Sequence, residues 1–186
     1  MSLLLRYTFM EKVMKNFILR EWKKEDAKAL AEAANNPNIA VNLRNSFPSP
    51  FSLDDANRLI DSFISNEGKK QISRAIVVDE KAVGSIAIFI KDDVYKKSGE
   101  LAYWLSEDYW RQGITSRAVR MICKEAFATF DIIRIFAEPY EYNVGSQGVL
   151  KKAGFIYEGT MRNGIYKNGK IHSYCMYSIL KEEMDL

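Results

Sequence analysis

The sequence contains few of the residues that bind metal ions or build disulfide frameworks. Its 186 residues include two cysteines, Cys123 and Cys175, and a single histidine, His172. Two cysteines far apart in the chain are too few for a disulfide framework, and one histidine does not complete a zinc site with them. We therefore expect no metal site, and we expect both thiols to be reduced core residues of a cytoplasmic protein.

Long apolar runs and a strong charge imbalance are also missing. No run approaches the ~18–20 apolar residues of a membrane-spanning helix, and Met1–Leu5 is too short for the apolar core of a signal peptide. Lys and Arg number 27 and Asp and Glu number 24, which leaves a net charge of +3. So small a surplus does not by itself hold a nucleic-acid backbone. We expect a cytoplasmic protein whose partners include neither a membrane nor a nucleic acid.

The chain length fits one domain, because a domain usually has roughly 100–200 residues. Met10 and Met14 precede the first segment with a regular pattern. We therefore treat residues 1–15 as a loose N-terminal extension or a consequence of the chosen start site. Residues 16–186 are expected to form a single domain.

Hydrophobic periodicity predicts strands and helices in a mixed order. The segment between Glu100 and Glu138 reads as strand, helix and strand, which predicts a parallel pair joined by a right-handed crossover. The predicted strands are 16–22, 71–79, 82–90, 100–105, 131–138, 155–163 and 173–180; the predicted helices are 24–34, one beginning near residue 53, 115–130 and 143–153, with a loop over 38–50.

The turn before the third long helix predicts an anion site. Trp-Arg-Gln-Gly-Ile-Thr-Ser at 110–116 joins a strand to a helix. The first N–H groups of a helix have no intrahelical partner, and the helix dipole favours negative charge there. Arg111, Arg117 and Arg120 add side chains that bind phosphate well, so a nucleotide-like cofactor is indicated. The alternative is that Gly113 only makes a tight turn and that Thr115 or Ser116 caps the helix.

Two segments together resemble the GNAT acyl-CoA N-acyltransferases, and more narrowly the branch with the RimJ/RimL-type ribosomal-protein Nα-acetyltransferases. They are Tyr-Trp-Leu-Ser-Glu-Asp-Tyr-Trp-Arg-Gln-Gly-Ile-Thr-Ser at 103–116 and Glu-Tyr-Asn-Val-Gly-Ser-Gln-Gly-Val-Leu-Lys-Lys-Ala-Gly-Phe-Ile-Tyr-Glu-Gly at 141–159. The resemblance extends over nearly all of the chain from about residue 16. It implies an α/β fold with a mixed, largely antiparallel central sheet, a splayed parallel strand pair, and helices on both faces.

The resemblance also implies the cofactor, acetyl-CoA. Its pyrophosphate would lie on the turn, its pantetheine arm along the end of the preceding strand, and the second segment would contribute from the other side. Where the family often has Gly or Ala at the end of the turn motif, this chain has Thr115. The implied cofactor-binding residues are Trp104, Leu105, Ser106, Arg111, Gln112, Gly113, Ile114, Thr115, Ser116, Asn143 and Ser146.

Three groups are candidates for the chemistry that the resemblance implies. Glu100, directly or through a water, is the candidate base; the alternative is a solvated carboxylate at a strand end. The backbone N–H of Leu105 is the candidate oxyanion donor. The resemblance to the Rim-type enzymes implies that Ser146 donates the proton to the thiolate; many other relatives use a tyrosine one turn later, where this chain has Leu150.

Departures from the family leave the acceptor open. Ile165 and Ser173 stand where relatives have acidic residues. We expect acetyl transfer to a primary amine by direct attack in a ternary complex, with a protein or peptide N-terminus preferred because segments 38–50 and 163–170 hold no carboxylate cluster. The alternatives are a polyamine or aminoglycoside acceptor, or a non-catalytic acyl-CoA sensor. The acyl length stays open, as does a homodimer formed through an exposed Trp22 or the last strand.

Overall fold

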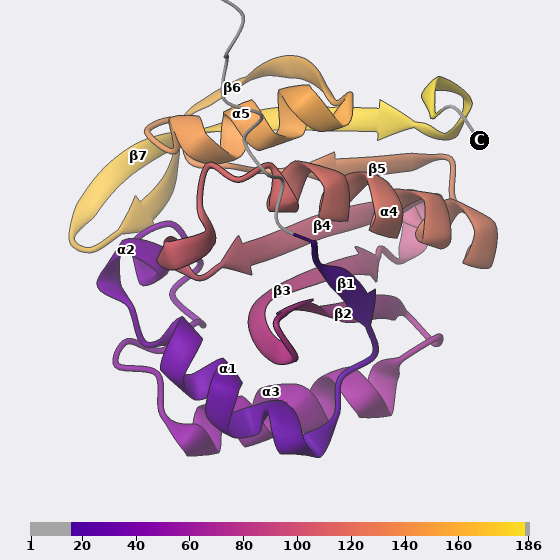
Figure 1. The fold of residues 1–186 in the computed structure, drawn as a ribbon. Helices are drawn as coiled ribbons and strands as arrows, with labels where there is room; N and C mark the ends of the chain where they lie inside the picture. Colours follow the sequence, from indigo (N-terminus) through magenta and orange to yellow (C-terminus); the bar gives the residue numbers. More distant parts are fainter. Residues whose placement is uncertain (1–15, 185–186) are drawn as a thin grey trace, which may run out of the picture.

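The computed structural model describes residues 16–184, which form a seven-stranded sheet covered by helices (Figure 1). The strand order is β1-β2-β3-β4-β5-β7-β6, and β4 and β5 form the parallel pair of this otherwise antiparallel sheet. This arrangement confirms the predicted α/β fold class. Residues 1–15, for which we expect an extension, lie outside the described part of the chain.

The strands are β1 Ile18–Arg20, β2 Gln71–Val78, β3 Lys81–Ile90, β4 Ser98–Leu105, β5 Arg134–Ala137, β6 Ile156–Lys167 and β7 Lys170–Leu180. The helices are α1 Ala27–Ala34, α2 Pro37–Ala40, α3 Leu53–Asn66, α4 Ile114–Thr129 and α5 Val144–Ala153. Short 3-10 helices lie at Lys24–Asp26, Asp93–Tyr95, Glu107–Tyr109 and Lys181–Glu183.

Two hydrophobic clusters hold the helices to opposite faces of the sheet. One joins α4 and α5 to the sheet, and the other joins α1 and α3 to its other face (Figure 1). Successive side chains of a strand point to opposite faces. In β4, Leu101 and Leu105 accordingly belong to the α4/α5 cluster, whereas Trp104 belongs to the α1/α3 cluster.

Local chemistry explains where the helices begin and end. Ser52 caps α3 by accepting a hydrogen bond from the Asp55 N–H at 3.1 Å, as its position before the apolar stripe predicts. Gly154 ends α5 in the left-handed region with φ of 100°. The N-cap of α4 is Gly113, with φ of 73°, and Thr115 and Ser116 lie inside the helix. The alternative in which Thr115 or Ser116 caps this helix was therefore wrong.

Three sequence-based expectations were wrong. The predicted loop over 38–50 starts within a short helix, α2, because Asn36 accepts the Asn38 N–H at 2.8 Å and Pro37 occupies the first helical position. The final hairpin is longer than predicted, since β6 runs to Lys167 and β7 starts at Lys170. Trp22 is not available to a dimer interface, because it is only 5% exposed and stacks on Phe63 with a centroid distance of 5.8 Å.

Both thiols are buried in the described part of the chain, and neither forms a disulfide there. Within residues 16–184 no group of His, Cys, Asp and Glu side chains has the arrangement of a metal site. Among the same residues, none of the helices has the length and apolar character that a membrane crossing requires.

Candidate active site

The site is built where β4 and β5 stop pairing. Their parallel register runs from Ser98↔Arg134 to Glu100↔Phe136. Strand β4 continues to pair with β3 as far as Leu105↔Gly84, while β5 ends at Ala137. The last residues of β4 therefore keep one neighbouring strand and lose the other.

The backbone of Leu105 faces the side from which β5 has departed. The next residue, Ser106, donates its N–H to the Val83 carbonyl at 2.8 Å. Because successive residues of an antiparallel strand direct their peptide groups to alternate sides, the N–H and carbonyl of Leu105 point away from β3. Consistently, the Leu105 carbonyl accepts a hydrogen bond from the Trp110 indole at 2.7 Å. The Leu105 N–H is thus directed away from β3, and its role as oxyanion donor stays a prediction.

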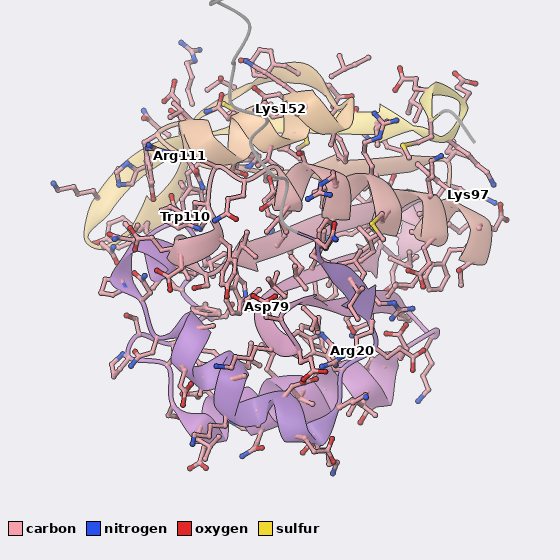
Figure 2. The ribbon with its side chains drawn as sticks, viewed as in Figure 1. Arg20, Asp79, Lys97, Trp110, Arg111 and Lys152 are labelled. Carbon is pink, nitrogen blue, oxygen red and sulfur yellow. The ribbon has the colours of Figure 1, made fainter. Side chains whose placement is uncertain are left out.

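The turn after β4 presents the positive end of α4. Arg111 and Gly113 have positive φ values of 59° and 73°, and Figure 2 shows Trp110 and Arg111 on the segment that joins β4 to α4. The first turn of α4 carries no acidic side chain. No other part of the described structure comes within 4 Å of the position that a Gly113 side chain would occupy. An anion therefore has open access to the start of this helix.

Other residues of the turn make local contacts. The Gln112 amide donates to the Asp108 carbonyl at 2.8 Å, and the Ser116 hydroxyl donates to the Gly113 carbonyl at 3.2 Å. Arg117 donates its Nε–H to the Gly113 carbonyl at 3.3 Å, and its guanidinium lies 4.8 Å from the Phe17 ring centroid. Cofactor contacts of Gln112, Ile114, Thr115 and Ser116 stay predictions.

Helix α5 brings Ser146 to the α4/α5 face of β4. Asn143 caps this helix, since its Oδ1 accepts the Ser146 N–H at 3.0 Å. The Ser146 hydroxyl lies 2.7 Å from the Tyr103 hydroxyl, which also donates to the Ser146 carbonyl at 3.2 Å. Burial raises the pKa of Tyr103, so its phenol keeps a proton that it can donate at neutral pH. The sequence analysis missed Tyr103, although its place on the same face as Leu105 was available from strand alternation.

A pair of carboxylates lies on the other face of the sheet. Arg44 Nη2 contacts Glu100 Oε1 and also lies 3.1 Å from Glu138 Oε2, while Lys91 Nζ lies 3.2 Å from Glu100 Oε2. Burial and the nearby charge of Glu100 raise the pKa of Glu138, against the opposing effect of Arg44 and Lys91. Glu138 was missed as a site residue. Its signal was its place as the last residue of the predicted strand 131–138, beside the splayed pair.

The surface beside these carboxylates is open at Ala102. This residue is exposed although it lies in a central strand, on the same face as Glu100 and Trp104. Trp104 packs its ring edge against Phe47, with centroids 6.2 Å apart, so its side chain lies on the face opposite α4 and α5. Its predicted cofactor contact stays untested. Ala102 gives an approach to Glu100 along the sheet.

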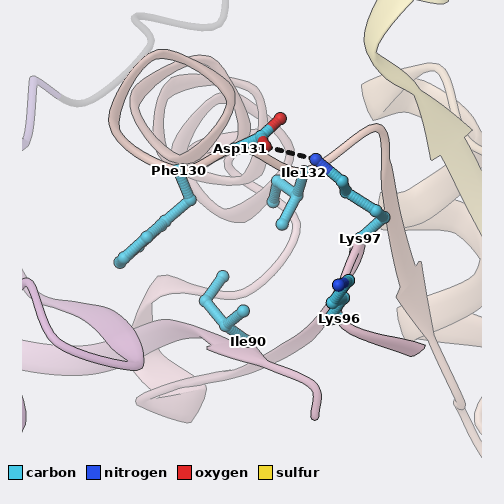
Figure 3. A pocket seen from close by; sticks show the side chains of 6 residues that line it. All are labelled: Ile90, Lys96, Lys97, Phe130, Asp131 and Ile132. Carbon is cyan, nitrogen blue, oxygen red and sulfur yellow. Dashed lines mark hydrogen bonds and ion pairs between the residues drawn. The ribbon is translucent and has the colours of Figure 1, made fainter. Parts of the chain in front are cut away.

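A cavity of about 350 Å³ lies elsewhere, beside the C-terminal end of α4 and the beginning of β4 (Figure 3). Its apolar wall consists of Ile90, Phe130 and Ile132, and a Lys97–Asp131 ion pair lies at its rim. The cavity lies on the α4 face beside the end of α4, whereas Leu105 and the turn before α4 lie at the other end of β4. Glu100 is near the cavity along β4 but belongs to the opposite face of the sheet. The cavity is therefore separate from the site.

Comparison with known proteins identifies the family. The family model described as "Acetyltransferase (GNAT) domain" matches residues 16–156, which is more than half of the chain. The chain belongs to the GNAT acetyltransferase family. As a GNAT N-acetyltransferase it is an enzyme of the class that the two sequence segments suggest, and the resemblance stated above is confirmed.

Individual relatives of this GNAT chain support the same assignment. It is 31% identical over 114 residues to the putative ribosomal N-acetyltransferase YdaF of Bacillus subtilis (strain 168), a match that spans 61% of this chain and 62% of that protein. Two solved structures share its fold. RimJ of Mycobacterium smegmatis in complex with CoA-disulfide has a TM-score of 0.83 at 19% identity, covering 93% of this chain and 86% of its own. RimL, a ribosomal L7/L12 α-N-protein acetyltransferase in complex with coenzyme A, has a TM-score of 0.79 at 21% identity, and the match covers 88% of this chain and 93% of RimL.

Proposed function

We propose that the protein transfers the acetyl group of acetyl-CoA to the free amino group of a protein or peptide N-terminus, by direct attack in a ternary complex. The observation that carries this proposal is the divergence of β4 from β5 after Glu100, with the Leu105 N–H directed to the side that β5 leaves. The similarity to YdaF, RimJ and RimL supports the choice of acceptor.

The residues at the divergence fit acetyl-CoA, which would supply an activated thioester. The open N-terminus of α4, from Arg111 to Ser116, suits the pyrophosphate because it offers backbone N–H groups without a competing acid. The free side of β4 near Leu105 and Ser106 suits the amide groups of the pantetheine arm, which pair with a strand edge as a peptide does. Solved structures of RimL and RimJ contain CoA or its disulfide. Asn143, which caps α5 and follows β5 in the chain, would approach the cofactor from the β5 side of the divergence.

Protein groups are available for each proton that the reaction moves. An acceptor ammonium loses a proton to the Glu100–Glu138 pair, and its nitrogen then attacks the thioester carbon. The Leu105 N–H donates to the oxyanion that forms. When the carbon–sulfur bond breaks, a proton passes from the Tyr103 hydroxyl through the Ser146 hydroxyl, 2.7 Å away, to the departing thiolate. The nitrogen loses its second proton as the amide forms, and this proton restores the Tyr103 hydroxyl, so that both hydroxyls are protonated at the end of the reaction.

Release of free CoA thiol tests this proposal. Acetyl-CoA is supplied with peptides of varied N-terminal residue, and separately with polyamines and aminoglycosides. Thiol release with peptides, together with a blocked N-terminus in the product, is the expected result. The cofactor part has its own test: Gly113→Asp adds a negative charge and a side chain at a φ of 73°, and should weaken acetyl-CoA binding at least tenfold. Unchanged affinity would remove the phosphate site.

One other function has specific support. The Glu100–Glu138 pair also suits a small polyamine, which would give thiol release with small amines and none with peptides.

A further inference from the structure

One guanidinium nitrogen bridges the two carboxylates of the site. Arg44 Nη2 contacts Glu100 Oε1 and lies 3.1 Å from Glu138 Oε2. The Arg44 side chain is 63% exposed, whereas those of Glu100 and Glu138 are 13% and 28% exposed. The arginine is thus an accessible cation that covers two less accessible acids. A primary ammonium group, with three N–H donors on one nitrogen, can make the same two contacts.

The carboxylate pair attracts a cation to this position. Burial and Glu100 both raise the pKa of Glu138, which means that its charged form is disfavoured unless a cation lies close by. Lys91 Nζ lies 3.2 Å from Glu100 Oε2 and also lowers the pKa of Glu138 from further away, so it supplies only part of the positive charge that Arg44 brings into contact with both acids. Removing the Arg44 charge therefore leaves a place that attracts another cation.

The backbone around Arg44 is held, while its side chain is long and exposed. On one side the Leu43 carbonyl accepts a hydrogen bond from the Tyr140 hydroxyl at 3.1 Å. On the other side Phe47 stacks on Phe51 with centroids 4.8 Å apart. Rotation of the Arg44 side chain alone would uncover the carboxylates, and the exposed Ala102 beside Glu100 leaves room for an approaching chain.

We infer that Arg44 occupies the place of the acceptor's ammonium group, and that a positively charged primary amine binds by displacing its guanidinium from Glu100 and Glu138. Arg44 is then an internal competitor that sets the acceptor affinity. The inference rests on the proposed function for the identity of the ligand as an amine acceptor. It predicts that removing the Arg44 charge improves acceptor binding, whereas an arginine that recognised the acceptor would have the opposite effect.

The test compares Arg44→Gln with two controls. Arg44→Lys keeps a cation at the position. Arg58→Gln makes the same charge change at an exposed arginine of α3 that pairs with Asp55. With the peptide that releases thiol fastest from the wild type, Arg44→Gln should lower the acceptor KM roughly fivefold, the scale of one exposed ion pair. The KM for acetyl-CoA should stay the same. The acceptor KM of Arg58→Gln should match that of the wild type, and the acceptor KM of Arg44→Lys should lie between those of the wild type and Arg44→Gln.

A raised acceptor KM in Arg44→Gln, or a KM equal to that of Arg58→Gln, would overturn the inference. Direct binding separates this failure from failure of the proposed function. Propylammonium is titrated into wild type and Arg44→Gln in the presence of CoA and followed by NMR, with propanol as the uncharged control. Tighter propylammonium binding in Arg44→Gln supports the inference even where no peptide reacts, and equal binding contradicts it.

Discussion

Removing the Tyr103 hydroxyl provides a sharp test of the proposed proton transfer. Tyr103→Phe deletes the group that lies 2.7 Å from the Ser146 hydroxyl and 3.2 Å from the Ser146 carbonyl, and it changes no other side chain. A positioned general acid contributes roughly 10²–10⁴-fold to a rate. Ser146 itself remains in Tyr103→Phe, so we expect a smaller loss of kcat, about tenfold, with little change in the KM for acetyl-CoA.

The stability cost of the same substitution follows from the hydrogen bond that it removes. The net value of such a bond is about 1 kcal/mol. For a domain of this size, that loss lowers Tm by about 2–4 °C, which leaves the variant folded at assay temperature. A control is Tyr157→Phe, because the Tyr157 hydroxyl also lies 2.7 Å from a hydroxyl, that of Thr160, on the edge strand β6. It should lose no activity.

A double-mutant cycle supplies the result that would refute the reasoning. If Tyr103 acts through Ser146, then Ser146→Ala and the double variant Ser146→Ala/Tyr103→Phe should have the same kcat. Once the Ser146 hydroxyl is absent, the Tyr103 hydroxyl has no route to the thiolate, so its removal should have no further effect. The assay is the initial rate of thiol release at saturating acetyl-CoA. Losses that multiply in the double variant would show that the two hydroxyls act independently, and the proposed path from Tyr103 to the thiolate would be wrong.

Two further substitutions test the charged groups. Burial and Glu100 raise the pKa of Glu138, so wild-type kcat should fall as pH is lowered through a pKa above that of an ordinary glutamate; Glu138→Gln should lower kcat at neutral pH and remove this dependence, and a Gln variant with the wild-type profile would exclude Glu138 as a base. Burial opposes the charge of Asp26, but two 2.7 Å hydrogen bonds from Arg20 and one from the Lys23 N–H overcome it and lower the pKa of Asp26. The stability that this carboxylate provides is present above the unfolded-state pKa of ~3.9 and is lost as pH falls through the lower folded-state value, so in urea unfolding Asp26→Asn should cost about 2 kcal/mol at pH ~7 and progressively less as pH is lowered below ~3.9; a cost that does not change with pH would contradict this account.

Local patterns predicted most of the fold because they act within a few residues. The apolar run before the Asp79–Glu80 turn and the run after it gave β2 and β3, and positive φ values of 48° and 65° at these two residues form the turn itself. Ser52 and Gly154 mark helix ends through hydrogen bonds that depend on near neighbours alone. Local patterns did not decide where α4 starts. The helix could be capped by Gly113 itself or by the hydroxyl of Thr115 or Ser116, and both arrangements fit the same sequence.

The acceptor side of the site could not be derived in the same way. Arg44 comes from the segment between α2 and α3, Glu100 from β4, and Glu138 follows β5, so their contact depends on how three distant segments pack. The sequence analysis looked for a carboxylate cluster within single segments and found none. In the structure Phe136 pairs with Glu100, and Glu138 lies two residues further on, so alternation puts the two carboxylates on one face. The register that brings them together cannot be read from either segment alone.

The alternation of β4 also explains why the divergence from β5 is needed. Tyr103 and Leu105 face α4 and α5, where Ser146 lies, whereas Glu100 and Ala102 face the other side. A continuous sheet would keep the thioester side and the amine side apart, because its hydrogen-bonded backbone separates the two faces. Beyond Glu100↔Phe136 that separation ends, and the Leu105 N–H points into the place where the faces connect. In the proposed reaction, an amine deprotonated by the Glu100–Glu138 pair meets there a thioester whose leaving group is protonated from the Ser146 side.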